Sequence, residues 1–214
     1  MPSKALDDGL IIGPDGLARC WWHGNDPLYL AYHDREWGRP CADDRYLFEK
    51  ICLEGFQSGL SWITILRKRE NFRRAFAGFD IEKLARFTER DAERLVTDAG
   101  IIRHRGKIDS TINNARRAIE LVEREGSLAS FVWQFEPDKK SRPARYDAAT
   151  LRAITRSEAS ATLAGELKRR GWSFFGPTTA YAFMQAVGLV NDHLHGCVCR
   201  RPCLEDRAVF ALPR

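Results

Sequence analysis

Apolar residues recur three and four positions apart over most of the chain after Asp43, the spacing that places side chains on one face of an α-helix. Asp43 or Asp44 can cap the first of these segments. Its apolar residues are Leu47, Phe48, Ile51 and Cys52, and those of the next segment are Leu60, Ile63, Leu66, Phe72, Phe76 and Phe79. That second segment ends near Gly78 and Asp80. The pattern predicts successive amphipathic helices.

Capping residues divide the rest of the chain into further helices. A polar side chain at a helix start satisfies free amides, and glycine suits the position after the last turn. Expected starts lie at Asp80, at Thr88 with Asp91 as a capping box, and at Ser157; expected ends lie at Gly100, Gly126 and Gly171. Apolar positions between Ile108 and Val122 form one stripe. No stretch alternates as adjacent strands do, so the predicted class is all-α, with about eight to ten helices.

The two ends of the chain lack this helical pattern. Residues 1–18 contain several Gly and Pro residues and show little periodicity, which predicts a flexible extension. Residues 204–214 are expected to form a C-terminal tail. The intervening residues 19–203 are enough for a single domain with a substantial apolar core. Inside it, EPDKKSRPARYD (136–147) is expected to be an exposed connection.

The composition is that of a globular protein. Of 214 residues, 44% are hydrophobic, and the apolar runs are too short to cross a bilayer. The N-terminal MPSKALDDGL lacks the basic start and apolar core of a signal peptide, so we expect a cytoplasmic location. In that compartment the six cysteines do not indicate a disulfide framework.

The formal net charge of +5 suits a polyanionic partner without identifying one. Basic residues gather in four short clusters, at 67–74, 101–107, 113–117 and 167–171. Each cluster alone is compatible with a solvated helix face. Convergence of the clusters in space would instead favour nucleic-acid binding.

A basic helix, a short apolar turn bounded by glycine and a second helix occupy about residues 160–190. The second helix begins at Pro177, where the missing N–H costs least. Helix N-termini present free amides, so the backbone around Gly176, Thr178 and Thr179 could hold a DNA phosphate. This layout predicts a helix-hairpin-helix module, although an ordinary turn between packed helices explains the spacing equally well.

The segment VNDHLHGCVC, residues 190–199, concentrates residue types that bind metals. His193 and Cys197 lie four positions apart, so both could reach one ion from a helical turn. Cys20 and His33 would complete a Cys2His2 set, which is typical of closed structural zinc sites. A zinc ion there would join the start of the domain to its end. The other residues that could serve as ligands are Cys199 and, with less support, His195 and His23.

Five blocks of sequence carry a family resemblance. They are RCWW, DPLYLAYHDREWG, LFEKICLEGFQSGLSWITILRKRENFRRAF, LVTDAGIIRHRGKI and FMQAVGLVNDHLHGCVC, which together cover most of residues 19–199. These blocks resemble the bacterial 3-methyladenine DNA glycosylase I family, which lies within the helix-hairpin-helix DNA glycosylase superfamily. The zinc ligands of that family match Cys20, His33, His193 and Cys197, in agreement with the spacing argument.

The resemblance also implies a pocket for a damaged base. It implies that Glu54 accepts hydrogen bonds from the edge of the damaged adenine, whereas the sequence alone would suggest a surface carboxylate. Tyr32 and Trp62 are similar to family residues that stack on or contact the base. Three further aromatic residues, Trp22, Tyr29 and Trp37, would line or support the pocket, and for Trp37 plain core packing is at least as good an explanation.

Two further positions bear on the mechanism. Gln57, Gly59 and Leu60 lie where the family's loop enters the duplex to fill the gap left by the flipped nucleotide. Phe56 stands beside that loop where a relative has a polar residue. Asn191 takes the place of the catalytic Asp of related glycosylases, and an amide cannot act as a general base.

The resemblance therefore implies a monofunctional DNA N-glycosylase that flips out 3-methyladenine and excises it hydrolytically, acting as a monomer on alkylated double-stranded DNA. Glu54 would be the catalytic residue, and one structural Zn²⁺ would be bound. A noncatalytic helix-hairpin-helix DNA-binding protein is the alternative, and Asn191 gives it weight. A zinc nucleobase deaminase fits poorly because its C-x-x-C signature after a Pro is absent.

Overall fold

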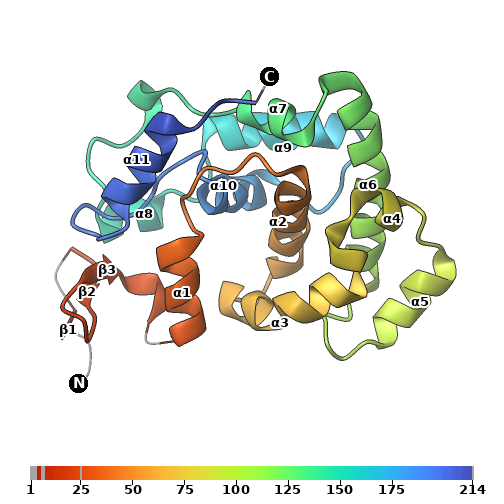
Figure 1. The fold of residues 1–214 in the computed structure, drawn as a ribbon, viewed down its shortest axis with the longest axis horizontal. Helices are drawn as coiled ribbons and strands as arrows, with labels where there is room; N and C mark the ends of the chain where they lie inside the picture. The colour runs from red at the N-terminus through yellow and green to blue at the C-terminus, as the bar shows by residue number, and fades with distance from the viewer. Residues whose placement is uncertain (1–3, 6–7, 25, 214) are drawn as a thin grey trace.

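The structure, a computed structural model, describes residues 4–5, 8–24 and 26–213. In these residues the chain forms eleven α-helices, three short 3₁₀ helices and three short strands (Figure 1). The α-helices are α1 (Pro27–Arg35), α2 (Asp44–Gln57), α3 (Trp62–Ala75), α4 (Ile81–Ala85), α5 (Glu89–Thr97), α6 (Arg105–Glu125), α7 (Leu128–Trp133), α8 (Ala148–Ala153), α9 (Glu158–Arg169), α10 (Pro177–Ala186) and α11 (Arg200–Val209). The mostly helical class is confirmed, with one more helix than the upper estimate.

Several predicted helix boundaries are confirmed. Asp43 caps α2 by accepting a hydrogen bond from the Tyr46 amide, and Ser157 begins α9 in a capping box. Thr88 and Asp91 form the capping box expected before α5. These short polar side chains fix where each helix starts because they satisfy amides that have no partner inside the helix.

Helix α2 forms the centre of the core. Helices α3, α6, α7 and α10 pack around it (Figure 1). Leu47, Phe48, Ile51, Leu53 and Phe56 are almost completely buried along its length. A helix buried over most of its length cannot keep all its polar residues in solvent, so the charged side chains buried on α2 need partners in the protein or in a ligand.

The N-terminal segment differs from the flexible extension predicted for residues 1–18. Strands β1 (Lys4–Ala5), β2 (Leu10–Ile12) and β3 (Ala18–Cys20) form an antiparallel sheet, with Leu10 opposite Cys20. Gly9 has a φ of +87° and approaches α8 so closely that a Cβ would lie 2.3 Å from the Ala148 side chain. Two or three residues per strand are too few to show an alternating pattern, so the sheet could not be predicted from hydrophobic periodicity.

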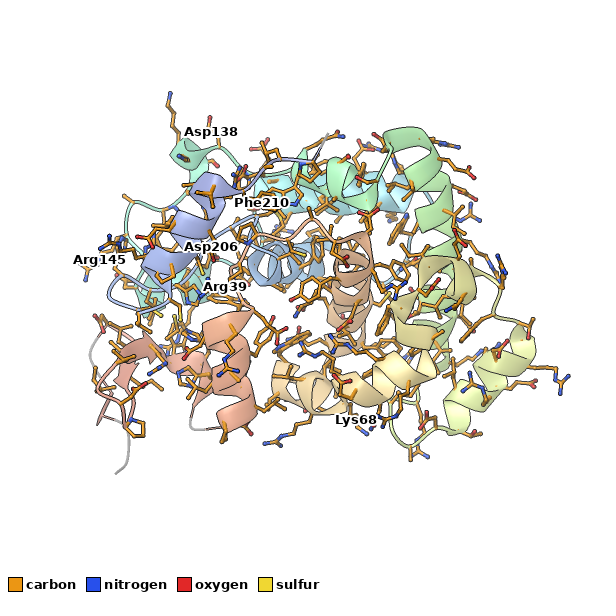
Figure 2. The ribbon with its side chains drawn as sticks, viewed as in Figure 1. Arg39, Lys68, Asp138, Arg145, Asp206 and Phe210 are labelled. Atoms are coloured by element: carbon orange, nitrogen blue, oxygen red, sulfur yellow. The ribbon has the colours of Figure 1, made fainter. Side chains whose placement is uncertain are left out.

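The predicted tail at 204–214 is likewise structured over most of its length, because α11 continues to Val209. Arg207 donates hydrogen bonds to the Glu136 carboxylate, and the rings of Trp133 and Phe210 lie 4.5 Å apart. Arg39 and Asp206 point toward one another and form an ion pair between the segment after α1 and α11 (Figure 2). Within the described part of the chain, no helix combines the length and apolar character needed to span a membrane.

Candidate active site and metal centre

Two adjacent residues of α1 face two different buried regions. Tyr32 lines a pocket that also contains Glu54, whereas His33 belongs to a cluster of cysteine and histidine side chains. Both side chains are buried, with 3% and 0% of their surface exposed. Successive helical residues point in directions about 100° apart, so one helix supplies side chains to both regions.

The pocket has a volume of about 270 Å³. Its walls are mainly aromatic, and its lining residues are Trp21, Trp22, Tyr29, Tyr32, Trp37, Glu54, Gln57, Trp62, Leu151, Ile154, Ala182 and Gln185. The structure therefore brings together all four aromatic residues predicted to bind the substrate, the predicted carboxylate and one predicted loop residue. Small-molecule sites typically combine such an apolar cavity with a few polar groups.

Aromatic rings in the pocket wall contact one another directly. The Trp22 ring lies 5.0 Å from the Tyr29 ring and 4.9 Å from the Trp37 ring, and Tyr32 lies 5.4 Å from Trp62. The Trp62 indole N–H is buried and has no hydrogen-bond partner among the described residues. Flat walls of this kind suit a planar ring, and the free N–H adds a donor for an occupant.

Glu54 is a buried acceptor without a protein donor. Its exposed fraction is 5%, and no hydrogen bond or ion pair joins its carboxylate to the described residues. Burial raises the pKa of Glu54 to about 7, although the positive charge of Lys50 acts in the opposite direction. A buried carboxylate left without donors is costly, so this arrangement favours an occupant that donates hydrogen bonds or carries positive charge.

Lys50 lies one helical turn before Glu54 and was not anticipated from the sequence. Its side chain is completely buried, and its ammonium donates a hydrogen bond of 3.2 Å to the Tyr32 hydroxyl. The nitrogen also lies 4.3 Å from the centre of the Tyr32 ring and 4.7 Å from that of Trp62. Burial lowers the pKa of Lys50 to about 8, although Glu54 acts in the opposite direction. A lysine inside the apolar run from Leu47 to Cys52 was the signal that could have revealed it.

Gln57 is the last residue of α2, and Gly59 and Leu60 belong to the turn between α2 and α3. Gly59 has a φ of +81°, which favours glycine, and Leu60 is 41% exposed beside the pocket. The buried Lys107 donates hydrogen bonds of 2.9 and 2.7 Å to the carbonyl oxygens of Phe56 and Ser58. The exposed Leu60 side chain therefore forms an apolar tip, and the hydrogen bonds from Lys107 fix the backbone of the turn.

Phe56 does not belong to the exposed part of this turn. Its ring is 1% exposed and packs 4.6 Å from Phe72 in the core. The replacement of a polar residue by Phe56 therefore affects core packing beneath the turn. The exposed tip of the turn is formed by Gly59 and Leu60.

The segment predicted to be a helix-hairpin-helix contains α9, α10 and the turn between them. The two helices pack against each other, and Gly176 is the N-cap of α10 without any side-chain cap. Gly176 and Thr178 are exposed, and Thr179 is half-buried. These three residues lie outside the aromatic pocket, at the start of α10.

The four basic clusters approach one another in two pairs. Arg69 and Arg73 of the first cluster form ion pairs with glutamates. Lys68 of the same cluster donates hydrogen bonds to backbone carbonyl oxygens directly before the cluster at 101–107. The clusters at 113–117 and 167–171 also meet, because Arg117 and Arg170 line the same surface hollow.

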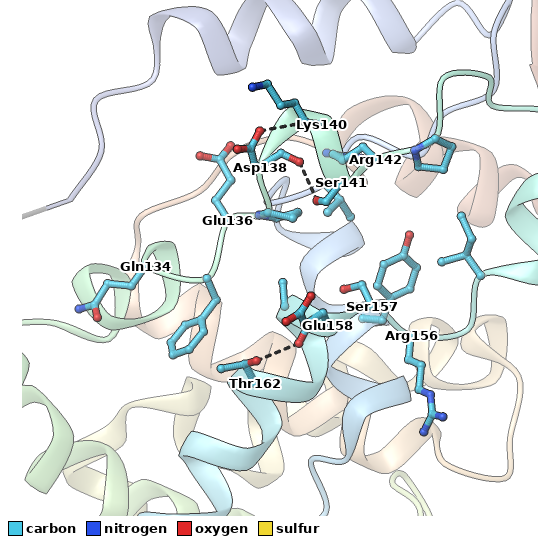
Figure 3. A pocket seen from close by; sticks show the side chains of 17 residues that line it. Gln134, Glu136, Asp138, Lys140, Ser141, Arg142, Arg156, Ser157, Glu158 and Thr162 are labelled. Atoms are coloured by element: carbon cyan, nitrogen blue, oxygen red, sulfur yellow. Dashed lines mark hydrogen bonds between the residues drawn. The ribbon is translucent and has the colours of Figure 1, made fainter.

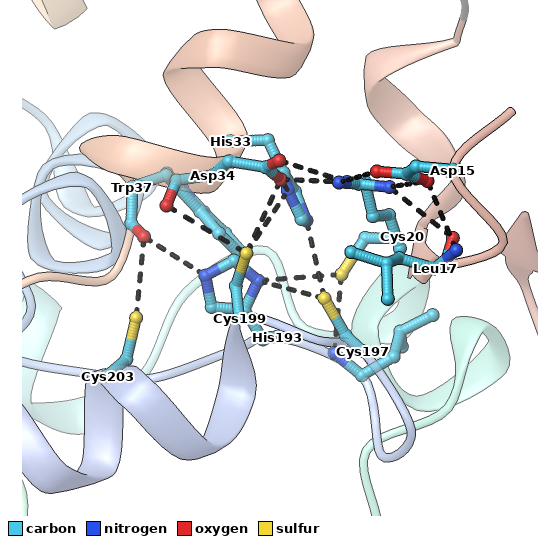
Figure 4. A network of polar contacts seen from close by, with 12 residues as sticks. Asp15, Leu17, Cys20, His33, Asp34, Trp37, His193, Cys197, Cys199 and Cys203 are labelled. Carbon is cyan, nitrogen blue, oxygen red and sulfur yellow. Dashed lines mark hydrogen bonds and ion pairs between the residues drawn. The ribbon is translucent and has the colours of Figure 1, made fainter. Parts of the chain in front are cut away.

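The second buried region is the metal-ligand cluster predicted from spacing. The ligand atoms of Cys20, His33, His193 and Cys197 all lie within 4.8 Å of one another and are buried (Figure 4). Cys197 Sγ lies 3.5 Å from His33 Nε2 and 3.5 Å from His193 Nδ1, and Cys20 Sγ lies 3.8 Å from the same His193 nitrogen. These four residues could hold one metal ion.

The outer nitrogens of both histidines have partners. His33 Nδ1 lies 2.7 Å from an Asp34 carboxylate oxygen, and His193 Nε2 donates to the Trp37 carbonyl at 3.0 Å. Arg19 in turn donates to both oxygens of Asp34 (Figure 4). Such outer contacts fix the orientation of metal-binding imidazoles. Contacts from Cys199 and Cys20 lower the pKa of the Cys197 thiol, which favours the thiolate that binds metals.

The remaining candidate ligands occupy different positions. Cys199 lies 3.4 Å from Asp34 Oδ1 and forms a second group with His33 and Asp34, at the edge of the first. His195 accepts a hydrogen bond from the Tyr146 amide outside the cluster. Both ring nitrogens of the buried His23 lack a partner among the described residues, but His23 is not part of either group.

Asn191 and Asp192 do not line the pocket. The Asn191 amide donates to the Arg200 carbonyl at 2.9 Å, and its oxygen accepts from the His193 amide at 3.2 Å. Asp192 is 1% exposed and accepts hydrogen bonds from Tyr181, Gln185 and Arg142. Both side chains therefore organise the turn before the cysteines, and Glu54 is the only carboxylate among the described residues that line the pocket.

A cavity larger than the aromatic pocket lies elsewhere, between the connection at 134–143 and the start of α9 (Figure 3). Its volume is about 830 Å³, and no residue predicted for the site lines it. The cavity is open, and Thr162 there bonds to the carbonyl of Glu158 on its own helix. Size alone therefore does not identify the candidate site.

Comparisons with known proteins agree with this geometry. The profile described as methyladenine glycosylase matches residues 22–201. DNA-3-methyladenine glycosylase 1 of Escherichia coli (strain K12) is 53% identical over 86% of this chain and 97% of its own length. A crystal structure of 3-methyladenine DNA glycosylase I superposes with a TM-score of 0.78 at 53% identity, over 85% of this chain and 99% of that chain. A Staphylococcus aureus enzyme, described with the structural basis of its 3-methyladenine recognition, gives 0.79 at 37% identity, over 85% and 96%.

Proposed function

The chain belongs to the methyladenine glycosylase family, and on that premise we propose that it is a DNA-3-methyladenine glycosylase. It cleaves the N-glycosyl bond between 3-methyladenine and deoxyribose in alkylated double-stranded DNA and leaves an abasic site. The observation that carries this proposal is Glu54, a carboxylate that has no hydrogen-bond donor among the described residues and is buried in a pocket with aromatic walls.

The chemistry of the lesion explains why so few polar groups are needed. Methylation at N3 makes the purine cationic, so it leaves with the bonding electrons as a neutral base. Water adds to the sugar carbon and loses its proton. Because the leaving group is already good, the protein's main task is to extrude the base and bind it between aromatic walls. Glu54 selects for the lesion because a buried carboxylate prefers a cationic ring to a neutral one.

Water is the proposed nucleophile rather than an enzyme amine. A lysine in the turn before α10 would be needed for lyase chemistry of the superfamily type, and FFGPTTAY contains none. Asn191 is engaged by backbone groups, which supports a mechanism without a general base at that position. The enzyme is therefore proposed to be monofunctional.

DNA binding is assigned to two backbone features. Gln57, Gly59 and Leu60 enter the duplex and fill the gap left by the flipped nucleotide, and the exposed Leu60 side chain supports this role. The α9–α10 pair acts as the helix-hairpin-helix, with Gly176, Thr178 and Thr179 at a phosphate. One chain is enough for this arrangement, so the proposed enzyme is a monomer.

The proposed metal is a structural Zn²⁺ held by Cys20, His33, His193 and Cys197, which would join the ends of one glycosylase domain at 19–203. Zinc–sulfur bonds of about 2.3 Å and zinc–nitrogen bonds of about 2.0–2.1 Å at tetrahedral angles separate sulfur from nitrogen by about 3.6 Å. The distances of 3.5, 3.5 and 3.8 Å support that fit. Bound zinc supplies folding free energy, and four protein ligands leave no open position for catalysis.

Release of the free base tests the proposed function. The purified protein is incubated with methylated duplex DNA, and the released bases are separated by chromatography. We expect 3-methyladenine from the wild type, and at least about a hundredfold slower release from Glu54→Gln with nearly unchanged affinity for undamaged DNA. A wild-type protein that binds DNA but releases no base would be a noncatalytic binding protein, and the proposal would be wrong.

A further inference from the structure

Lys50 is an unusual residue to find beneath a pocket for a cationic base. The ammonium has three donors and no acceptor, so in the 3.2 Å contact with Tyr32 the phenol oxygen must accept. No other hydrogen bond of the Tyr32 hydroxyl is present among the described residues. The hydroxyl proton therefore cannot point at Lys50, and it has no acceptor in the part of the protein that the structure describes.

Tyr32 and Glu54 line the same pocket, and the charge of Glu54 contributes to raising the pKa of Tyr32, after the larger effect of burial. A hydroxyl donor beside a carboxylate acceptor matches the exposed edge of adenine, where the N7 acceptor lies next to the N6 donor. This match requires the Tyr32 proton to point into the pocket. Without the lysine, no donor would restrict the rotation of the hydroxyl, and its proton would no longer be directed into the pocket.

We propose that Lys50 is a positioning residue that fixes the Tyr32 hydroxyl as a hydrogen-bond donor toward the flipped base. This inference rests on the proposed function, since it assigns a new role within the same pocket. Lys50 does not touch the base in this arrangement, because Tyr32 and Trp62 cover its ammonium. It acts through the direction of one proton.

The charged surroundings of Lys50 support a protonated ammonium in this position. Glu54 and Glu49 on α2 and Glu36 after α1 favour the charge, whereas burial and Arg69 on α3 oppose it. The rings of Tyr32 and Trp62, and more distantly Tyr46, present their faces to it. Aromatic faces stabilise a buried cation without accepting its protons, so Tyr32 remains the hydrogen-bond acceptor.

A double-mutant cycle tests this role. Single-turnover release of 3-methyladenine is measured for the wild type, Lys50→Met, Tyr32→Phe and the double variant. Met has nearly the shape of Lys without its donors, and we expect it to slow release about tenfold when Tyr32 is present and less than about twofold when Phe replaces it. The same slowing in both backgrounds would make Lys50 a packing residue and overturn the inference.

Lys107→Met is the matched control, because Lys107 is the other lysine among the described residues that is buried and bonds to the protein interior. Its partners are backbone carbonyls of the α2–α3 turn, so its effect should be equal in the Tyr32 and Phe backgrounds. If Lys50→Met does not fold, Lys50→Gln replaces it in the cycle, since its amide is about one bond too short to reach Tyr32. If Lys50→Gln slows base release equally in the Tyr32 and Phe backgrounds, the inference is contradicted in the same way.

The pH profile of kcat/KM separates positioning from packing. The charge of Lys50 lowers the pKa of Glu54 against the effect of burial, so Lys50→Met should move the acidic limb to higher pH. An unmoved limb would mean that Lys50 is not charged in the working enzyme. If the wild type releases no 3-methyladenine, the proposed function itself fails. Release by the wild type with additive variants rejects only the role of Lys50.

Discussion

The two buried polar regions that share α1 differ in how their polar atoms are satisfied. Around the metal-ligand cluster, His33 and His193 have outer partners in Asp34 and the Trp37 carbonyl, and Arg19 holds Asp34. In the aromatic pocket, Glu54 has no donor and the Trp62 N–H has no acceptor among the described residues. The first region is complete without an organic ligand, and the second lacks partners that a base could supply.

This difference separates residues that stabilise the fold from residues that select a substrate. A fully bonded buried network adds rigidity, whereas unpaired buried groups lower stability and persist where a ligand repays the cost. Changes in the cluster should therefore affect folding first, and changes in the pocket should affect the reaction first.

The largest effect is expected from loss of a cluster ligand. Cys197→Ser should reduce metal content and lower the free energy of unfolding by about 5 kcal/mol or more, because the ligands are buried and the proposed metal would hold both ends of the domain. Thermal unfolding and elemental analysis measure both. Cys41→Ser, at a half-buried cysteine outside the cluster, is the control and should stay within about 1 kcal/mol. Unchanged stability of Cys197→Ser would remove the distinction between the two regions.

Two glutamates of α2 are expected to show opposite effects, one on the rate of base release and the other on stability. Glu54→Gln should slow base release by about 10²–10³-fold and leave stability within about 1 kcal/mol, since Glu54 has no protein donor to lose. Glu49 accepts three hydrogen bonds from Arg73, so Glu49→Gln should cost about 1–3 kcal/mol of stability with little change in rate. Single-turnover kinetics and chemical unfolding distinguish the patterns. Reversed outcomes would place the substrate-selecting carboxylate elsewhere.

The pH dependence of kcat/KM should be confined to the pocket. Burial raises the pKa of Glu54 to about 7, so its acceptor form is lost as the pH falls, and activity at pH 5.5 should be roughly thirtyfold below the plateau. Burial lowers the pKa of Lys50 to about 8, so its charge is lost as the pH rises above that value. Because Glu54 and Lys50 interact, the acidic and basic limbs of the pH profile report apparent pKa values of the pair, and neither limb belongs to one residue alone. An acidic limb that survives in Glu54→Gln would show that another group titrates.

The smallest effect is expected at Asn191. Its side chain bonds to backbone groups beside the cluster, so Asn191→Asp should change the rate by no more than about twofold and cost about 1 kcal/mol of stability through the lost donation to Arg200. Single-turnover release and thermal unfolding measure these changes. A rate gain above about tenfold would mean that a carboxylate there reaches the reacting base and works as a general base.

Sequence reasoning worked where a local rule or a long family match applied. The i, i+4 spacing of His193 and Cys197 and the resemblance together led to four residues that lie within 4.8 Å of one another. Capping residues located the starts of α2, α5 and α9. In each case the physical cause lies within a few residues or within a motif.

The features that were missed depend on contacts distant in sequence. The sheet at β1–β3 has strands of two or three residues and is held by Gly9 against α8, which no local pattern indicates. Leu151 of α8 and Gln185 of α10 line the pocket beside residues of α1 and α2 that are about 90 or more positions earlier in the chain. Lys50 is ordinary by composition, and its importance follows from burial beneath Tyr32 and Trp62.

Trp22 and Trp37 form the wall between the two regions. The Trp22 ring lies 5.1 Å from His33 and 5.0 Å from Tyr29, and the Trp37 ring lies 4.7 Å from His193 while lining the pocket. Both indoles should therefore change their fluorescence when the metal is lost as well as when a ring stacks in the pocket. An emission titration with ligand reports occupancy of the pocket only in samples whose metal loading is held constant.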